Sequence, residues 1–211
     1  ALEIAPGQRH AFDRVVEILD AAERWEELGK ALRERINVEV DVERLAELHR
    51  RLAELARAHL DDRELARQQL NALLELSSDD PAALETLGEL YEADGRWAEA
   101  ADTWIRRARV ESSKTRLRDL LLRLGRIYQD EAPDLKRGIL SLTKVLALDE
   151  NNVEALQRLS DLYMKDLDFE QALAVTTRLY ELEADPQRKV DHLLRIANIH
   201  EDGLRDAHQA S

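Results

Sequence analysis

The sequence predicts an all-α protein made of repeated pairs of antiparallel helices. Two observations support this fold class: apolar residues recur at helical spacings along most of the chain, and the pattern of residues 79–112 returns on both sides of that stretch. Of the 211 residues, 44% are hydrophobic and 36% are charged, so the chain can bury a large core and stay highly soluble. Prolines and glycines are few, which leaves little room for linkers, and we expect one continuous domain over residues 1–211.

Residues 79–112 are predicted to form two helices joined by a tight turn. Asp80 is a favoured N-cap residue, and Pro81 suits the first helical position because its φ is fixed near the helical value. The first helix carries apolar and small side chains at helical spacings, at Leu84, Leu87, Gly88, Leu90 and Tyr91. It should end at Asp94 and Gly95, where glycine permits the left-handed conformation. The second helix carries Trp97, Ala100, Ala101, Trp104 and Ala108 along one side.

This stretch resembles the tetratricopeptide repeat, whose pattern W-x2-L-G-x2-Y…A-x3-F extends over about 34 residues. The matching positions here are Leu84, Leu87, Gly88, Tyr91, Ala100 and Trp104. Leu84 replaces the family's tryptophan and Trp104 replaces its phenylalanine, so both positions stay bulky and apolar. The resemblance implies a right-handed α-solenoid, in which the first helices of successive repeats line a concave face that binds other proteins.

The same spacing recurs along nearly the whole chain. The small residues of successive first helices lie at alternating steps of 37 and 35 residues, at Val16, Ala53, Gly88, Gly125, Ser160 and Ala197. The true period is therefore a pair of repeats, and we call this 72-residue unit a double repeat. The predicted repeats cover residues 6–40, 41–78, 79–112, 113–149, 150–184 and, incompletely, 185–211.

Odd and even repeats differ in the turn between their two helices. Odd repeats have a short turn followed by an aromatic residue, at Trp25, Trp97 and Phe169. Even repeats have one extra turn residue and an aspartate that can cap the second helix, at Asp62, Asp134 and Asp206.

Both ends of the sequence are predicted to interrupt the array. Residues 2–5 look like the tail of a second helix, and the second helix of the sixth repeat should only have begun by Ser211. Alternating arrays of this kind look like the large repeat proteins of bacterial genomes, and we expect the chain to be a fragment of one. Because each repeat needs a neighbour to cover its apolar face, we also expect some end-to-end self-association.

The composition argues against several kinds of partner. The net charge of −13 opposes nucleic-acid binding, which needs a basic stripe to neutralise phosphates. No segment approaches the roughly 20 apolar residues of a membrane span, so no membrane partner is expected. The chain has no cysteine, which fits a reducing cytoplasm and is also compatible with a periplasm; we expect a cytoplasmic location.

No residue pattern predicts catalysis. The sequence has no HExxH, no glycine-rich phosphate loop and no G-x-S-x-G motif. His49 and His200 stand where other repeats have packing residues, and we interpret both as packing substitutions. His192 and His200 are about 12 Å apart along a helix, too far to share one metal ion. We therefore expect no catalytic residue, no metal and no cofactor.

The resemblance places partner-binding residues on the first helices, one and four positions after the small residue and three before it. These groove positions are Arg50, Glu54, Arg57, Glu85, Glu89, Glu92, Leu122, Arg126, Gln129, Gln157, Asp161 and Met164. Asn198 is the only asparagine directly after a small residue, which argues against the carboxylate clamp that some family members use. The resemblance implies a peptide or helix of a partner protein as the ligand.

Glu85 and Glu89 form a like-charge pair, which costs an isolated helix roughly 0.2–0.5 kcal/mol. Either Arg50, Arg57 and Arg126 on flanking helices neutralise these acids, which we favour, or a basic partner does so. The predicted function is a non-catalytic protein–protein interaction scaffold that binds in this groove. The alternatives are a structural spacer or self-assembling rod without a groove ligand, and a regulatory domain of a larger protein.

Overall fold

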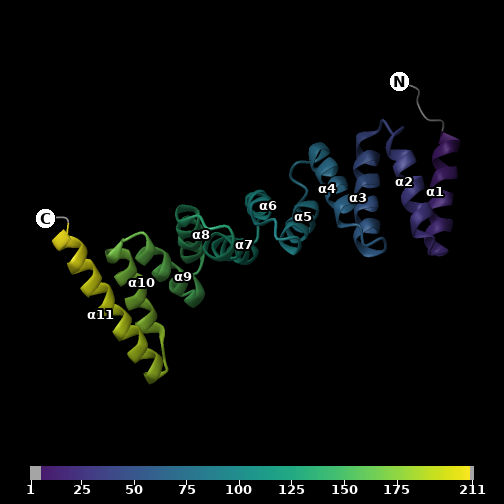
Figure 1. The fold of residues 1–211 in the computed structure, drawn as a ribbon. Helices are drawn as coiled ribbons and strands as arrows, with labels where there is room; N and C mark the ends of the chain where they lie inside the picture. Colours follow the sequence, from purple (N-terminus) through teal and green to yellow (C-terminus); the bar gives the residue numbers. More distant parts are fainter. Residues whose placement is uncertain (1–5, 210–211) are drawn as a thin grey trace. The chain divides into compact units, whose positions relative to one another are not determined.

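The structure, a computed structural model, describes residues 6–209. Over that range it contains eleven α-helices, one short π-helical segment and no strand, which confirms the all-α prediction. The helices group into two compact units, the first ending at Arg96 and the second beginning at Trp97 (Figure 1). The organisation as a single domain stays a prediction. The predicted helix tail at residues 2–5 lies outside the described residues.

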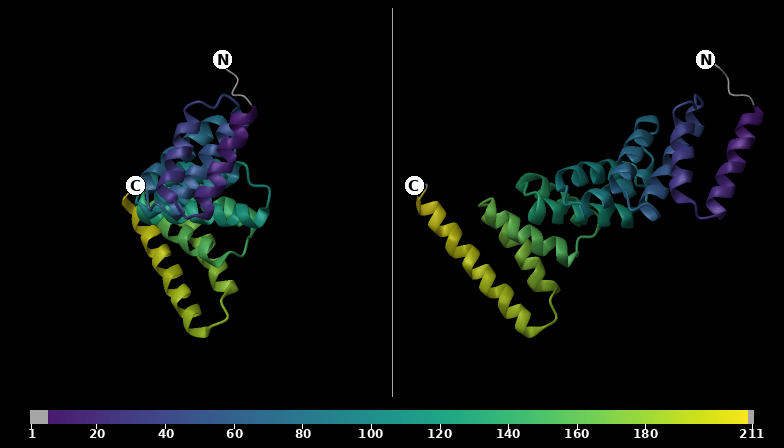
Figure 2. Two further views of the ribbon diagram at one scale, coloured as in Figure 1. Left: turned by 90° about the vertical axis from the view of Figure 1, so that its right-hand side faces the viewer. Right: turned by 45° about the vertical axis from the view of Figure 1, so that its right-hand side comes forward.

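In the first unit, each helix packs against the next one along the chain (Figures 1 and 2). Its helices are α1 (Pro6–Ala21), α2 (Trp25–Ile36), α3 (Val42–Ala58), α4 (Arg63–Leu76) and α5 (Pro81–Ala93). Leucines form much of the core, and Leu28, Leu32, Leu52 and Leu73 are almost fully buried. Burial of one leucine side chain stabilises a fold by about 1.5–3 kcal/mol, so the packing of these helices is the main source of their stability.

The second unit continues the same arrangement of helices packed in chain order. Its elements are α6 (Trp97–Arg109), α7 (Lys114–Arg126), the π-helical segment η1 (Ile127–Glu131), α8 (Leu135–Leu148), α9 (Val153–Lys165), α10 (Phe169–Leu182) and α11 (Pro186–Gln209). Trp104, Leu142 and Leu159 are among its most deeply buried side chains. The predicted cap at Asp80 is present, since its side chain accepts backbone N–H bonds at the start of α5. Asp185 accepts such a bond at the start of α11.

The period of one double repeat appears directly in the backbone of the odd repeats. Glu23, Gly95 and Leu167, at equivalent positions of successive odd repeats, have positive φ angles of 55°, 68° and 60°. The residue after Glu23, Arg24, donates its backbone N–H to the carbonyl of Leu19 at 2.9 Å, and the same bond recurs one and two double repeats later at 2.8 and 2.9 Å. This left-handed turn with its bond to the preceding helix ends all three first helices in the same way. It confirms the predicted period.

The turn between the two helices of an even repeat differs from the turn in the odd repeats. It also differs between the second and fourth repeats, and a proline explains that difference. Asp61, which follows α3, has a positive φ of 49°. The residue one double repeat later is Pro133, whose ring fixes φ near −65° and excludes that conformation. The helix of the fourth repeat instead continues from α7 into η1 before the chain turns. Asp62 and Asp134 then cap α4 and α8 as predicted, accepting backbone N–H bonds at 2.9 and 3.0 Å.

Small residues of the fourth and fifth repeats lie where neighbouring helices approach closely. A Cβ added at Gly125 would overlap the side chain of Leu142 on α8, and one at Gly138 would lie 3.0 Å from a leucine methyl group of α9. Ser160 fills the corresponding place on α9, where its hydroxyl meets that of Thr176 at 2.7 Å in the core. Close approach of the helices therefore depends on the small side chains that define the repeat.

The predicted second helix of the sixth repeat does not occur within the described residues. Helix α11 runs without a break from Pro186 to Gln209, past the position at which the other even repeats turn. His200 is exposed, so its interpretation as a packing residue is wrong, whereas His49 is half-buried and its Nδ1 lies 2.8 Å from the side-chain oxygen of Gln69.

Three glutamates at equivalent positions of successive double repeats order the linkers after the odd repeats. They are Glu39, Glu111 and Glu183. Each carboxylate accepts hydrogen bonds from backbone N–H groups of its own linker, at 2.7–3.2 Å. Arg35 and Arg107, four residues earlier, form buried ion pairs with the first two glutamates. We did not predict these residues, although their regular spacing is visible in the sequence.

These contacts lower the pKa of all three glutamates. Burial favours the neutral form of Glu39, but hydrogen bonds from Arg35 and from backbone N–H groups outweigh it. For Glu111 and Glu183, the main cause is the backbone N–H two residues further along the chain. Because the pKa in the folded state lies below the ordinary value of 4.5, the carboxylates stabilise the fold above that pH. This stabilisation is lost as the pH falls through the lowered pKa.

Replacing the three linker glutamates by glutamine should make the stability less sensitive to acid. At neutral pH the Glu39→Gln, Glu111→Gln, Glu183→Gln variant should melt at a lower temperature, since two buried arginines lose their charged partners. Between pH 5 and about 3, its melting temperature should fall less steeply than that of the wild type. Circular dichroism melts over this pH range measure both effects. Glu170→Gln, at an exposed position on α10, serves as the control, and equal acid slopes in the triple variant and the wild type would contradict the assignment.

The left-handed turn position should tolerate glycine in every odd repeat but penalise a side chain. Gly95→Ala should lower the melting temperature by roughly 2–4 °C, because a Cβ costs about 1 kcal/mol or more in this conformation. Leu167→Gly, at the equivalent position, should not lower it, because the substitution removes that strain. A loss of the same size in both variants, measured by thermal unfolding, would show that the turn conformation is not the cause.

Candidate functional site

Arginine–carboxylate pairs join the first helix of one repeat to the first helix of the next. In the first unit they are Arg44–Asp13, Arg51–Asp20 and Arg50–Asp80, at 3.3, 2.9 and 2.8 Å. In the second unit they are Arg126–Glu154 at 2.6 Å, Arg158–Asp130 at 2.8 Å and Arg195–Asp161. Exposed pairs of this kind contribute about 0–1 kcal/mol each, so they order the surface without dominating the stability.

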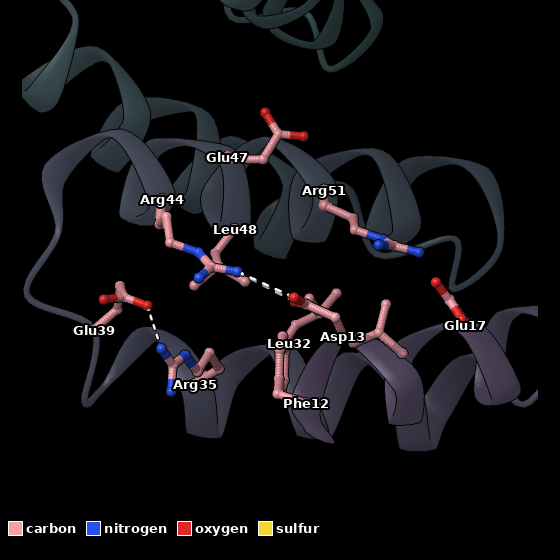
Figure 3. Close-up of a pocket in the computed structure, with 11 residues that line it drawn as sticks. Phe12, Asp13, Glu17, Leu32, Arg35, Glu39, Arg44, Glu47, Leu48 and Arg51 are labelled. Carbon is pink, nitrogen blue, oxygen red and sulfur yellow. Dashed lines mark hydrogen bonds and ion pairs between the residues drawn. The ribbon is translucent and has the colours of Figure 1, made fainter. Parts of the chain in front are cut away.

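A hollow of about 230 Å³ lies between α1, α2 and α3; we call it the α1/α3 hollow. Phe12, Val16 and Leu32 give it apolar lining. Charged side chains of α1 and α3 surround this lining, and Figure 3 shows Arg44 reaching from α3 to Asp13 on α1. The hollow therefore combines an apolar lining with a charged rim.

A second hollow of about 610 Å³, the α9/α11 hollow, lies within the second unit. Its lining residues are Gln157, Asp161, Leu179, Asp191, His192, Leu194, Arg195 and Asn198. Arg195 forms an ion pair with Asp161 through Nη2. The Nε of Arg195 is buried and has no hydrogen-bond partner among the described residues. This hollow thus presents carboxylates, amides and one unsatisfied donor.

The two hollows are built at equivalent positions, two double repeats apart. Asp13, Glu17, Glu47 and Arg51 of the first correspond to Gln157, Asp161, Asp191 and Arg195 of the second. Halfway between, the sequence has Glu85, Glu89, Asp119 and Arg123 at these positions. Other lining residues change in kind, since Leu48 corresponds to His192 and Arg35 corresponds to Leu179. An acid-rich frame with one arginine is therefore repeated, while the lining differs between copies.

The predicted groove residues occupy three kinds of environment. Two of them, Gln157 and Asp161, line the α9/α11 hollow. Three have side-chain partners: Arg50 with Glu47 and Asp80, Arg126 with Glu154, and Gln129 with Arg158. The exposed ones are Glu54, Arg57 and Glu89, and the half-buried ones are Glu85, Glu92, Leu122 and Met164. Their contact with a partner stays a prediction.

Arg50 and Arg126 pair with carboxylates other than the acidic pair on α5. Partial burial opposes ionisation of Asp80, but a backbone N–H of α5 and the Arg50 guanidinium outweigh it and lower the pKa of that carboxyl. The Arg126 guanidinium is the main cause of the lowered pKa of Glu154. Of the three arginines in our favoured explanation, two thus have other carboxylate partners, and neutralisation of the α5 acids by Arg57 stays a prediction.

Arg51 and Arg195 are site residues that the spacing rule for groove positions missed. Each lies two positions before the small residue of its helix, where the rule places no contact. With Arg123 they form a series at intervals of one double repeat, and this recurrence was the available signal.

The two hollows are lined by apolar, charged and hydrogen-bonding side chains. Among the residues that the structure describes, no cluster of histidine and acidic side chains could hold a metal ion. None of the helices described is both long and apolar enough to cross a membrane. The chemistry present in the two hollows is that of reversible hydrogen bonds and ion pairs.

No model of a known protein family matches the sequence. One curated protein with detectable similarity is the transcription factor tau 131 kDa subunit of Saccharomyces cerevisiae, which is 25% identical over 120 residues. These residues make up 57% of this chain and 11% of that subunit, so the chain spans a small part of the relative it matches.

Solved structures with a similar fold include MamA and YrrB. MamA has a TM-score of 0.53 and 16% identity, with 77% of this chain and 85% of that chain covered. YrrB, described as a tetratricopeptide-repeat protein with an unusual peptide-binding site, has a TM-score of 0.50 and 19% identity, with 78% and 91% covered. At such identities the similarity concerns the fold. The chain therefore has the tetratricopeptide-repeat fold that the spacing of Gly88, Tyr91 and Ala100 predicted.

Proposed function

We propose that the chain is a non-catalytic protein-binding scaffold whose first helices contact a partner at the α1/α3 and α9/α11 hollows. The proposed ligand is a peptide segment that carries lysine or arginine. The observation that carries this proposal is the recurrence of one acid-rich frame at equivalent positions two double repeats apart. Each hollow would offer such a segment the carboxylates and the arginine of this frame.

The differences between the two linings support recognition of a particular segment. His192 and Leu179 in one hollow replace Leu48 and Arg35 in the other, so each hollow presents its own apolar and hydrogen-bonding groups. A ligand that cannot form hydrogen bonds with these groups would leave buried polar atoms unpaired, which costs free energy. Such ligands are therefore excluded. The frame would supply affinity and the lining would supply selectivity.

The α9/α11 hollow shows how a basic peptide would bind. The carboxylate of Asp191 lies on its rim and would pair with a lysine or arginine of the ligand. A peptide carbonyl would accept a hydrogen bond from the buried Nε of Arg195, and satisfying a buried donor is worth about 1–3 kcal/mol. Exposed pairs such as Arg195–Asp161 are weak enough to rearrange when the ligand enters.

Exchanging the two residues of the Asp161–Arg195 pair should weaken peptide binding without lowering the stability of the fold. In the Asp161→Arg, Arg195→Asp double variant the ion pair can reform, so the melting temperature should stay within about 2 °C of the wild type. Peptides selected from a random display library on the immobilised wild-type chain should bind this variant at least roughly tenfold more weakly, because the charges that face them are exchanged. Fluorescence anisotropy measures the affinities.

A matched control reverses an ion pair outside both hollows. Arg178 and Glu181 on α10 lie 2.8 Å apart, and their exchange should change neither affinity nor melting temperature. Equal binding by the wild type and the Asp161→Arg, Arg195→Asp variant would contradict the proposed site. Failure to enrich any peptide would favour the spacer instead.

A further inference from the structure

An apolar groove of about 660 Å³ runs between α6 and α8 across α7, within the second unit. We call it the α6/α8 groove. Its large apolar lining residues are Ile105, Leu117, Leu121, Leu124, Leu140 and Leu148. Leu140 is 56% exposed and Leu148 is 37% exposed. Clustered exposed apolar side chains at a hollow are typical of surfaces that bind a partner.

The α6/α8 groove lies on a different face of α7 from the predicted groove residues. Leu117, Leu121 and Leu124 recur at i, i+4 and i+7, so they share one side of the helix. Leu122 and Arg126 lie about 100° or more around the helix axis from that side. The α6/α8 groove is therefore separate from the surface on which the proposed function rests.

Tyr128 lines this groove with a buried side chain that is 4% exposed. Its hydroxyl interacts with the guanidinium of Arg137. The guanidinium of Arg137 lies over the ring, 5.9 Å from its centroid. The interaction with the hydroxyl raises the pKa of Arg137, so the arginine stays charged at the edge of the groove.

The rim of the α6/α8 groove is basic. Arg109, Arg137 and Lys144 line it, and no acidic residue does. Arg137 lies 3.5 Å from Asp134, whereas Arg109 and Lys144 form no ion pair with any carboxylate of the described residues. In a chain with a net charge of −13, this rim is a local reversal of charge. Charge complementarity therefore favours an acidic ligand here.

The equivalent place in the second repeat has different chemistry. One double repeat earlier, Leu121, Leu140, Ser141 and Lys144 correspond to His49, Gln68, Gln69 and Ala72. There His49 and Gln69 lie 2.8 Å apart and satisfy each other. The fourth repeat thus differs from its copy in residues that make the groove apolar and basic.

We propose that the α6/α8 groove binds an amphipathic helix of a partner protein. Its apolar face would carry leucine, isoleucine or phenylalanine at i, i+3 or i+4, and i+7, and its flanks would carry aspartate or glutamate. On α8 the groove lining extends from Arg137 to Leu148, about 16 Å along the axis, which matches the length of three helical turns. The acids would face Arg109 and Lys144.

Two synthetic helices test the charge requirement on the full chain. Both are about 15 residues long with leucine at i, i+3, i+4 and i+7; one has glutamate on its flanks and the other has lysine. The acidic helix should bind at least roughly tenfold more tightly, and it should shift the methyl NMR signals of Leu140 and Leu148. Equal affinities, or no binding of the acidic helix, would overturn the proposal.

Three variants locate the binding. Leu140→Glu should abolish binding of the acidic helix, whereas Val153→Glu, at a similarly exposed apolar residue outside the groove, should leave it unchanged. Tyr128→Phe should weaken binding about two- to tenfold, because Arg137 at the rim then loses its interaction with the hydroxyl. Unchanged affinity in Leu140→Glu, or equal losses in Leu140→Glu and Val153→Glu, would contradict the groove.

Discussion

The glutamate in the linker after each odd repeat fixes how one repeat leads into the next. Glu39, Glu111 and Glu183 accept hydrogen bonds from the linker backbone, and the first two are held by buried arginines. A buried ion pair is favourable only when both charges are present and hydrogen-bonded, so this contact strongly restricts the linker geometry. The Arg35–Glu39 pair also lines the α1/α3 hollow. Joining of repeats and formation of the candidate site thus depend on the same contact.

Most of the fold could be predicted because its determinants are local in sequence. The N-cap at Asp80, the left-handed turn at Gly95 and the period of one double repeat all depend on residue types at fixed spacings. The π-helical segment was missed, although Pro133 forbids the turn that Asp61 makes. The continuous α11 was not predicted, because the repeat pattern places a turn before Asp206 that the chain does not form.

The candidate site was predictable only in part. Spacing selects Asp161 as a groove position, but it does not show which carboxylate a long arginine side chain will reach. Arg50 and Arg126 therefore pair with acids that we did not expect, and Arg195 was missed. The α6/α8 groove is harder still to predict, since its lining comes from three helices. Comparing the sequences of repeats that lie one double repeat apart identifies some of these site residues. The comparison distinguishes the acid-rich frame, which is repeated, from the lining residues, which differ between repeats.

Hydrogen–deuterium exchange of the full chain, with and without a display-selected peptide, tests most directly the claim that the first helices carry the binding face. We predict slower exchange in α9 and α11, or in α1 and α3, where the two hollows lie. Exchange in α4 and α8, the second helices of the even repeats, should stay unchanged. Protection confined to those second helices, with none in the first helices, would contradict the claim.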